Sequence, residues 1–439
     1  MCGIYFTNKK ESVRLDSKFL NRGPDYLNQK KGDNFFMGHS LLSLTGEFTP
    51  QPVINEKINI IFNGQIYNYD KKTYKSDSYY ILEEYIKDKK LFWKNLDGEY
   101  AIVIYDQQKN SVIFLTDIFG TKPLFYSLKN NNIAISSLRS TLELNGHQDI
   151  IKCAPNTIYE FNFSSFNLSI QSDYFKFNLD QYKTSFGDWD RLFLKSVKKR
   201  FSETKHDIIL PLSGGHDSGA IACAFDLLNI NYYSFSFFKN EHQKILFKRL
   251  LKRYIKSPLK TKFKYLPLKE SARERISSYL YTDCDPYFYG PNLDELHIDG
   301  RQDSGAIGLT YILEKSKKSN NNIKIVASGQ GGDEIYSNNQ TYNFGYPNPK
   351  FFTDDLKSIF PWQNFYHGAQ TSYLAKEESI GGSFGLETRY PFIDKDLVQE
   401  YLNLTPKLKN QYYKSPITNF LLSNGYPFRE GSAKTGFSV

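Results

Sequence analysis

One stretch of this 439-residue chain decides the fold of its C-terminal half: Asp207-Ile208-Ile209-Leu210-Pro211-Leu212-Ser213-Gly214-Gly215-His216-Asp217-Ser218. The apolar part predicts a buried strand, and the glycines that follow predict a turn into a helix starting near Asp217. Glycines let a backbone approach a phosphate, and the first N–H groups of a helix point at such an anion. A glycine turn without a ligand is the alternative. The complete pattern Ser-Gly-Gly-x-Asp-Ser after a strand favours phosphate binding.

The loop predicts a particular kind of phosphate site. It has no lysine, so it is not a Walker loop, and it is similar to the pyrophosphate loop of ATP pyrophosphatases. Asp217 would be out of place beside phosphates unless it shares Mg²⁺ with them. A second glycine loop, residues 328–334, follows an expected strand at 323–329, and its Asp333 could supply a second Mg²⁺ ligand. We expect these residues of the two loops to bind the phosphates of ATP and pyrophosphate: Ser213, Gly214, Gly215, Asp217, Ser218, Ser328 and Gly329.

The surroundings of the first loop predict a parallel, doubly wound α/β sheet. Helix patterns at 189–201, 220–228 and 241–254 alternate with strand patterns at 207–212 and 232–238. This alternation is typical of βαβ units. The C-terminal third has mostly helical periodicity, and the polar run 315–322 predicts a loop.

The N-terminal half differs in that strand patterns predominate. Strand patterns occur at 58–62, 100–106, 112–115 and 133–135, with a helical pattern at 78–89, and Asn63-Gly64 is a turn signal. Together they predict a layered sheet domain. Residues 164–190 lack a sustained period, so we expect two domains, at 1–185 and 186–439.

A candidate nucleophile stands at the start of the chain. If Met1 is trimmed, Cys2 becomes the N-terminus and carries both a thiol and a free α-amine. The amine can serve as general base, directly or through a water, because its pKa lies near neutrality.

Composition narrows the class of protein. Hydrophobic residues make up 40% of the chain and charged residues 23%, which is typical of a globular protein. The net charge is +9, but the lysines are scattered and no nucleic-acid-binding motif accompanies them, so we expect anionic substrates and no nucleic acid. The four cysteines form no CxxC pair and suit a reducing cytoplasm. No apolar run is long enough for a membrane span. No signal peptide is visible, because the polar run Asn8-Lys9-Lys10-Glu11 follows soon after Cys2.

The ordered motifs together resemble those of the glutamine-dependent asparagine synthetase family, nearly from end to end. In the N-terminal half the resemblance rests on Cys2-Gly3-Ile4, Arg22-Gly23-Pro24-Asp25, His39, residues 62–68, Ser76-Asp77, residues 96–101 and residues 117–124. In the C-terminal half it rests on both glycine loops, residues 234–236, residues 385–394 and Lys434-Thr435-Gly436-Phe437.

The resemblance implies an α+β N-terminal nucleophile (Ntn) sandwich followed by an α/β ATP-pyrophosphatase domain. It implies that Cys2 hydrolyses glutamine and that Asn63 and the Gly64 N–H form the oxyanion hole. Asp77 and Gln65 match glutamine-binding positions, and Ser236 matches an ATP-binding position. The released ammonia would cross a tunnel and displace AMP from an acyl-adenylate made from ATP and a carboxylate. The implied roles in that step are metal ligation by Asp217 and Asp333 and catalysis by Glu387 and Lys434. A homodimer is expected from the family alone.

Four departures from the family pattern bear on substrates. Leu41 stands where the family has an arginine that clamps the glutamine carboxylate, and Gln65 stands where it has a glutamate. Gln330 replaces a carboxylate that faces the acceptor. Residues 303–309 stand where the family has an arginine-containing stretch that recognises aspartate, and they contain no arginine. The acceptor is therefore aspartate by family default, or another carboxylate such as a sugar uronic acid in surface-polysaccharide synthesis.

Three rival functions remain open at this stage. The first is an ammonia-dependent ligase whose glutaminase is weakened. The second is a catalytically silent binding protein, which the intact Asp217, Ser218 and Asp333 disfavour. The third is nucleic-acid modification such as tRNA thiolation, which the lack of paired cysteines disfavours.

Overall fold

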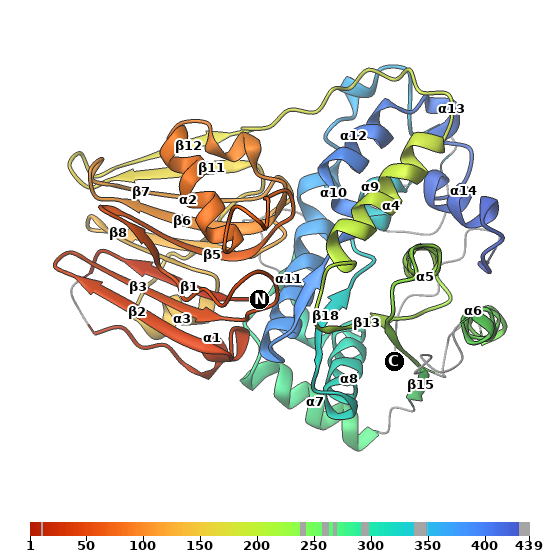
Figure 1. Ribbon diagram of the computed structural model, residues 1–439, viewed down its shortest axis with the longest axis horizontal. Coiled ribbons are helices and arrows are strands. Elements are labelled where there is room, and N and C mark those ends of the chain that lie inside the picture. Colours follow the sequence, from red (N-terminus) through yellow and green to blue (C-terminus); the bar gives the residue numbers. More distant parts are fainter. Residues whose placement is uncertain are drawn as a thin grey trace. The chain divides into compact units, whose positions relative to one another are not determined.

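A computed structural model of the chain (Figure 1) describes residues 1–9, 12–237, 243–256, 263–266, 270–290, 298–337, 348 and 350–429. The chain divides into two compact units. Unit 1 holds residues 1–176 with two later segments, 281–287 and 377–387, and unit 2 holds residues 177–280, 288–376 and 388–439. The expected domain boundary at 185/186 stays a prediction. No helix among the described residues has the length and apolar character needed to cross a membrane.

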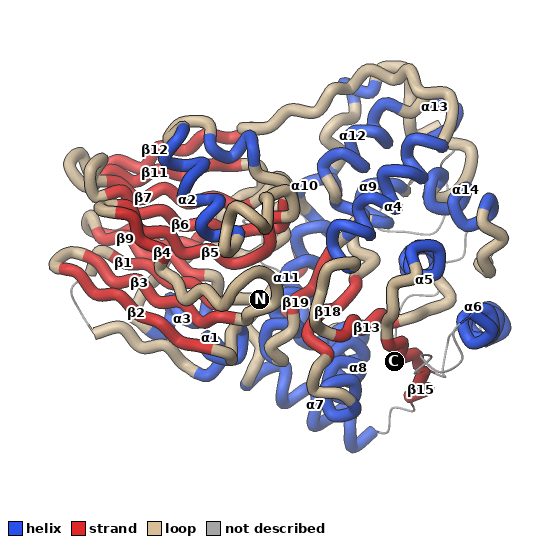
Figure 2. Tube along the Cα trace, in the orientation of Figure 1, coloured by secondary structure: helices blue, strands red, loops and turns tan. Residues whose placement is uncertain are grey.

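Unit 1 is built on two six-stranded sheets, whose strands are drawn red in Figure 2. The first has the order β10-β8-β9-β1-β3-β2 and the second β12-β11-β7-β6-β5-β4. The strands of the first sheet are β1 Gly3–Thr7, β2 Tyr26–Gly32, β3 Phe35–Leu41, β8 Phe125–Lys129, β9 Asn132–Ser136 and β10 Ile151–Lys152. Those of the second are β4 Val53–Asn55, β5 Ile58–Ile66, β6 Gly98–Asp106, β7 Ser111–Thr116, β11 Thr157–Asn162 and β12 Asn167–Ser172.

Three apolar clusters show how the layers of unit 1 stack. One cluster takes side chains from both sheets, among them Phe6 of β1 and Val103 of β6, and so lies between the sheets. A second lies between the β5 sheet and the helices α2 Asp77–Lys87 and η1 Phe92–Asn95. A third packs α1 Ser17–Arg22 and α3 Arg139–Leu144 on the other sheet. The unit is thus a helix–sheet–sheet–helix sandwich, the α+β architecture expected from the sequence.

Unit 2 carries a five-stranded sheet of order β15-β14-β13-β18-β19. Its strands are β13 Asp207–Pro211, β14 Tyr233–Phe237, β15 Phe263–Leu266, β18 Ile323–Ala327 and β19 Glu387–Arg389, and the unit boundary falls within β19. Strand β13 pairs in parallel with both β14 and β18. The chain runs outward through α5 His216–Leu228, β14, α6 Gln243–Lys256 and β15, and then returns to place β18 on the other side of β13. This reversal makes the carboxyl ends of β13 and β18 a topological switch point, the usual ligand position in a doubly wound fold.

The remaining described elements are mostly helical. Before the sheet lies α4 Gly187–Phe201, and within and after it come α7 Glu270–Thr282, β16 Phe288–Tyr289, β17 Ile298–Asp299, η3 Gly300–Gln302, α8 Ser304–Ser319 and α9 Gly332–Tyr336. The C-terminal part adds η4 Leu356–Ser358, α10 Gln363–Tyr366, α11 Gly368–Ser383, η5 Pro391–Ile393, α12 Lys395–Asn403, α13 Pro406–Lys409 and α14 Ser415–Ser423. The helical character predicted for the C-terminal third is confirmed.

Two local predictions were wrong. The Asn63-Gly64 turn signal lies inside β5, where Asn63 pairs with Ala101 and Gly64 with Tyr100. The polar run 315–322 is not all loop, because α8 continues to Ser319. Lys317 and Lys318 occupy the last turn of that helix, where positive charge is favourable beside the carbonyl end of a helix dipole.

Candidate active sites

The first candidate site surrounds Cys2, immediately before β1. The Cys2 backbone N donates to Oδ1 of Asn63 at 2.8 Å, and Leu42 N lies 3.5 Å from Cys2 Sγ. Burial, the largest influence, raises the pKa of the Cys2 thiol. The thiol is therefore protonated at neutral pH and needs a base before it can act as a nucleophile. Met1 precedes it and is also buried; its expected removal stays a prediction.

The Asn63 amide, which is bonded to Cys2 N, has a free donor. Because Cys2 N is a donor, the oxygen of the Asn63 amide must face it, which fixes the position of Nδ2. This Nδ2 is buried and has no hydrogen-bond partner in the described part of the chain. The neighbouring Gly64 has φ +136°, and a Cβ there would lie 2.0 Å from Glu99 O. Only glycine fits at this position without strain.

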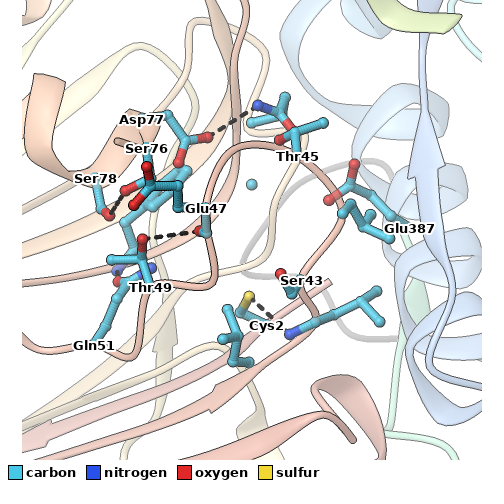
Figure 3. A pocket seen from close by; sticks show the side chains of 16 residues that line it. Cys2, Ser43, Thr45, Glu47, Thr49, Gln51, Ser76, Asp77, Ser78 and Glu387 are labelled. Carbon is cyan, nitrogen blue, oxygen red and sulfur yellow. Dashed lines mark hydrogen bonds between the residues drawn. The ribbon is translucent and has the colours of Figure 1, made fainter. Parts of the chain in front are cut away.

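A pocket of about 400 Å³, including its open mouth, lies next to Cys2 (Figure 3). All its lining residues belong to unit 1. They are Cys2, Leu41, Leu42, Ser43, Leu44, Thr45, Glu47, Thr49, Gln51, Phe62, Gly64, Gln65, Ser76, Asp77, Ser78 and Glu387. Four of the sequence-predicted residues of the N-terminal site line this cavity, namely Cys2, Gly64, Gln65 and Asp77, whereas Asn63 does not. Glu387, which was expected near an adenylate, also lines it.

Asp77 and Gln65 are bonded to each other within this pocket. Gln65 Nε2 donates to Asp77 Oδ2 at 3.0 Å, and Thr45 Oγ1 donates to Gln65 Oε1 at 2.6 Å. Ile66 N also donates to Asp77 Oδ2, at 3.3 Å. Burial nonetheless raises the pKa of Asp77 to about 7, with further upward pressure from Glu387. The charge of Asp77 therefore changes near neutral pH.

A buried group of charges lies behind Cys2, also within unit 1. Arg22 Nε donates to Cys2 O at 3.1 Å, and Arg22 Nη1 donates to Glu378 O at 3.2 Å. Lys122 Nζ lies 2.8 Å from Glu378 Oε1 and 3.7 Å from Glu99 Oε2. Removing one partner from such a buried pair is costly because the other charge is left uncompensated. The group therefore holds the carbonyl of Cys2 in place through Arg22.

The second candidate site is the loop between β13 and α5 in unit 2. Ser213 Oγ lies 2.9 Å from Ser218 Oγ and accepts from Gly215 N at 3.1 Å. Gly215 is the residue before the first turn of α5, so Gly214 and Gly215 stand at the positive end of that helix. The loop therefore has the strand–glycine–helix geometry that suits a phosphate group.

Ser236 supports the loop from the neighbouring strand β14. Its hydroxyl donates to Leu212 O at 2.5 Å, and the residue is fully buried. The side chain therefore stabilises the chain just after β13. The contact with ATP expected for Ser236 stays a prediction.

The second glycine loop packs directly on the first. It runs from Ser328 after β18 into α9, and Ser328 N donates to Arg389 O at 3.1 Å. A Cβ on Gly332 would lie 2.4 Å from Asp217 Oδ1, and one on Gly329 would lie 2.8 Å from Asp217 Cβ. Glycine is thus required at both positions for the close approach, which brings Asp217 and Asp333 to the same place.

Lys414 joins the two carboxylates. Its Nζ lies 2.6 Å from Asp217 Oδ2 and 2.8 Å from Asp333 Oδ1. Tyr413 OH donates to Asp333 Oδ1 at 2.7 Å. The sequence analysis missed Lys414 and Tyr413, because Tyr412-Tyr413-Lys414-Ser415 has no recognisable pattern and lies about two hundred residues from the first loop.

The two carboxylates suit a divalent cation. Oxygens of Asp217 and Asp333 both lie within hydrogen-bond distance of Lys414 Nζ, so the two carboxylates point toward the same positive charge. Two carboxylates shared with phosphate oxygens are a common way to hold Mg²⁺. Among the described residues, no group of three or more His, Cys, Asp or Glu side chains is placed to hold a metal without such help. The residues present therefore fit a metal that arrives with a polyphosphate.

Arg249 and His216 are further residues that the sequence analysis did not single out. Arg249 Nη1 donates to Ser213 O. Burial lowers the pKa of His216 to about 3, aided by Lys414 and Arg249, so this ring is neutral. Lys434 lies outside the described residues.

Known proteins resemble the chain over most of its length. Residues 1–179 match the model of the glutamine amidotransferase domain family. The chain is 26% identical over 442 residues to the protein named "Putative asparagine synthetase [glutamine-hydrolyzing] 1" of Methanocaldococcus jannaschii, covering 92% of this chain and 74% of that one. It is 24% identical to asparagine synthetase B [glutamine-hydrolyzing] of Escherichia coli, covering 93% and 76%.

Residues 1–179 belong to the glutamine amidotransferase domain family, and the chain as a whole is similar to glutamine-dependent asparagine synthetases. Its relatives are named as glutamine-hydrolysing synthetases, which are carbon–nitrogen ligases with glutamine as amide donor.

Proposed function

We propose that the chain is an ATP-consuming, amide-forming ligase that takes ammonia from a glutamine-type amide. The observation that carries the proposal is the Asn63 side chain, whose Oδ1 accepts from Cys2 N while its buried Nδ2 is left without a partner. A buried, unpaired donor on a side chain bonded to the backbone of the nucleophile suits the oxyanion of a tetrahedral intermediate. The Gly64 N–H is the second donor of this proposed oxyanion hole.

The first reaction follows from these groups. Once Met1 is removed, the amine of Cys2 takes the thiol proton, directly or through a water, and the sulfur attacks the amide carbon. The carbon–nitrogen bond then breaks, and the leaving nitrogen takes a proton to depart as ammonia. Water hydrolyses the thioester to a carboxylic acid and restores the thiol. Asp77 binds the ammonium group of the donor, and Gln65 orients Asp77.

The second reaction uses the glycine loops of unit 2. The acceptor carboxylate attacks the α-phosphorus of ATP, pyrophosphate leaves, and ammonia then displaces AMP from the acyl carbon. Ser213, Gly214, Gly215 and Ser218 bind the pyrophosphate, together with Ser328 and Gly329, and Lys414 balances its charge. Asp217 and Asp333 would hold Mg²⁺, which would supply further positive charge beside the phosphates. Glu387 and Lys434 keep the catalytic roles that the family resemblance implies.

The acceptor is proposed to be aspartate, with another carboxylate such as a sugar uronic acid as the alternative. Gln330 favours the alternative, because it replaces a family carboxylate that faces the acceptor. The deciding experiment measures pyrophosphate release from ATP, Mg²⁺ and ammonia with aspartate and a panel of uronic acids and their nucleotide sugars. Release with aspartate, and asparagine as product, supports asparagine synthesis. Release with another acid alone assigns a different acceptor, and no release with any acid contradicts the ligase.

A second candidate is a ligase that uses free ammonia because its glutaminase is weak. The hydrogen bond between Gln65 and Asp77 favours this candidate, since it engages the carboxylate expected to hold the donor. The test compares wild type with Cys2→Ala in product formation from glutamine and from ammonia. Equal rates from ammonia with no use of glutamine by either protein would favour the second candidate.

A further inference from the structure

The charged side chains in the Cys2 pocket all have the same sign. Glu47, Asp77 and Glu387 line it, and none of its lining residues, all of which lie in the described chain, is Lys, Arg or His. Figure 3 draws these three carboxylates around the same space as Cys2. A ligand in this pocket therefore meets acidic and neutral groups only.

The nearby buried cations are already bonded to other groups of the protein. Arg22 is bonded to the carbonyl of Cys2 and to Glu378, and Lys122 is paired with Glu378 and Glu99. Neither cation lines the pocket. To reach a ligand, either would have to leave a buried acidic partner uncompensated, which is unfavourable.

Leu41 completes the apolar part of the pocket. This side chain at the end of β3 is 7% exposed and lines the cavity beside Leu42 and Leu44. The following residue, Leu42, is anchored by its N–H next to Cys2 Sγ. An anionic group at Leu41 would lose its water without gaining a counter-charge.

The free form of glutamine carries both an ammonium and a carboxylate. In this pocket the ammonium is attracted by the acidic residues, whereas the carboxylate is repelled by them and finds no positive side chain. A donor whose carboxyl end is uncharged keeps the attraction and avoids the repulsion. Amide, ester and peptide derivatives of the glutamine carboxyl group have this property.

We propose that the Cys2 pocket selects a primary-amide donor with a free amine and a blocked, uncharged carboxyl end, and that Leu41 sets this preference. The inference rests on the proposed function, because it names the donor of the reaction at Cys2. It extends that function from glutamine itself to carboxyl-blocked glutamine, such as a glutaminyl residue at the amino end of a peptide.

The test measures binding separately from hydrolysis. The Cys2→Ala protein is titrated calorimetrically with L-glutamine and with L-glutaminamide, its α-carboxamide. We expect glutaminamide to bind roughly tenfold or more tightly, as loss of an unpaired, repelled charge predicts. Equal or tighter binding of glutamine overturns the inference, and so does failure of both compounds to bind.

Leu41→Arg in the same Cys2→Ala background should reverse the preference, and Leu41→Met is the matched control that changes shape without adding charge. If Leu41→Arg does not fold, the ratio measured in the Cys2→Ala protein still decides. Failure of the proposed function has a different signature. In that case the wild type hydrolyses neither amide, or Cys2→Ala leaves hydrolysis unchanged, whatever the ratio of the two affinities.

Discussion

Lys414 Nζ lies 2.7 Å from Oδ1 and 2.6 Å from Oδ2 of Asp217, so one buried ammonium spans both oxygens of the carboxylate. The same nitrogen lies 2.8 Å from Asp333 Oδ1. Neighbouring carboxylates raise the pKa of Lys414, which therefore stays charged at neutral pH, although burial acts in the opposite direction. The two glycine loops are thus tied together by a residue that belongs to neither of them.

Substitution of this lysine should disable the ATP reaction. We expect Lys414→Met to lower acceptor-dependent pyrophosphate release about 100-fold or more, because a fixed positive charge beside the phosphates is lost. Hydrolysis of the amide donor should be unchanged. Lys409→Met is the matched control, since Lys409 is also buried but donates to the neutral groups Gln181 Oε1 and Leu402 O. Equal losses in the two variants would mean that Lys414 acts only on the fold.

Removal of the thiol should abolish the reaction of the amide donor without affecting the ATP reaction. Cys2→Ala should abolish ammonia release from the donor and leave product formation from added ammonia intact, because the ATP site does not use the thiol. Cys153→Ala is the control, since Cys153 is a free, buried cysteine of the same unit. Ammonia release by Cys2→Ala at the wild-type rate would exclude Cys2 as the nucleophile. Mass spectrometry of the intact protein should also show that Met1 is absent.

The sequence predicted the parts of the fold that depend on local patterns. Hydrophobic periodicity located β5, α4 and β13, and the string at 213–218 located the first loop. It could not predict contacts made by distant residues without a motif. Lys414 reaches Asp217 across 197 positions, and no feature of its neighbours signals that contact.

Local patterns also misled where the tertiary environment dominates. Asn63-Gly64 is a turn dipeptide, yet the pairing with β6 continues through it, because a backbone without Cβ can lie against Glu99 O. The hydrogen bond between Gln65 and Asp77 was equally beyond prediction, since it depends on how the end of β5 meets the start of α2.

Asp77 should make donor binding depend on pH. Burial raises its pKa to about 7, so the carboxyl group is mostly neutral at pH 6 and ionised above neutrality. Since only the ionised form attracts an ammonium, donor affinity in the Cys2→Ala protein should rise roughly eightfold between pH 6 and pH 7.5. Calorimetry at several pH values measures this rise. Adding Asp77→Asn should weaken binding and flatten the profile, and an unchanged slope would assign the titration to another group.

The last prediction concerns the backbone at Gly64. Alanine there would need φ +136° and would place its Cβ 2.0 Å from Glu99 O. We expect Gly64→Ala to destabilise the protein by about 2–5 kcal/mol through strain and overpacking, as measured by thermal or urea unfolding. Gly146→Ala is the control, because Gly146 also has a positive φ of +75° but a Cβ there meets nothing within 4 Å. If both variants lose the same stability, the loss at Gly64 comes from its dihedral angle and not from the contact with Glu99. The close packing of β5 on β6 would then not be what holds Asn63 beside Cys2.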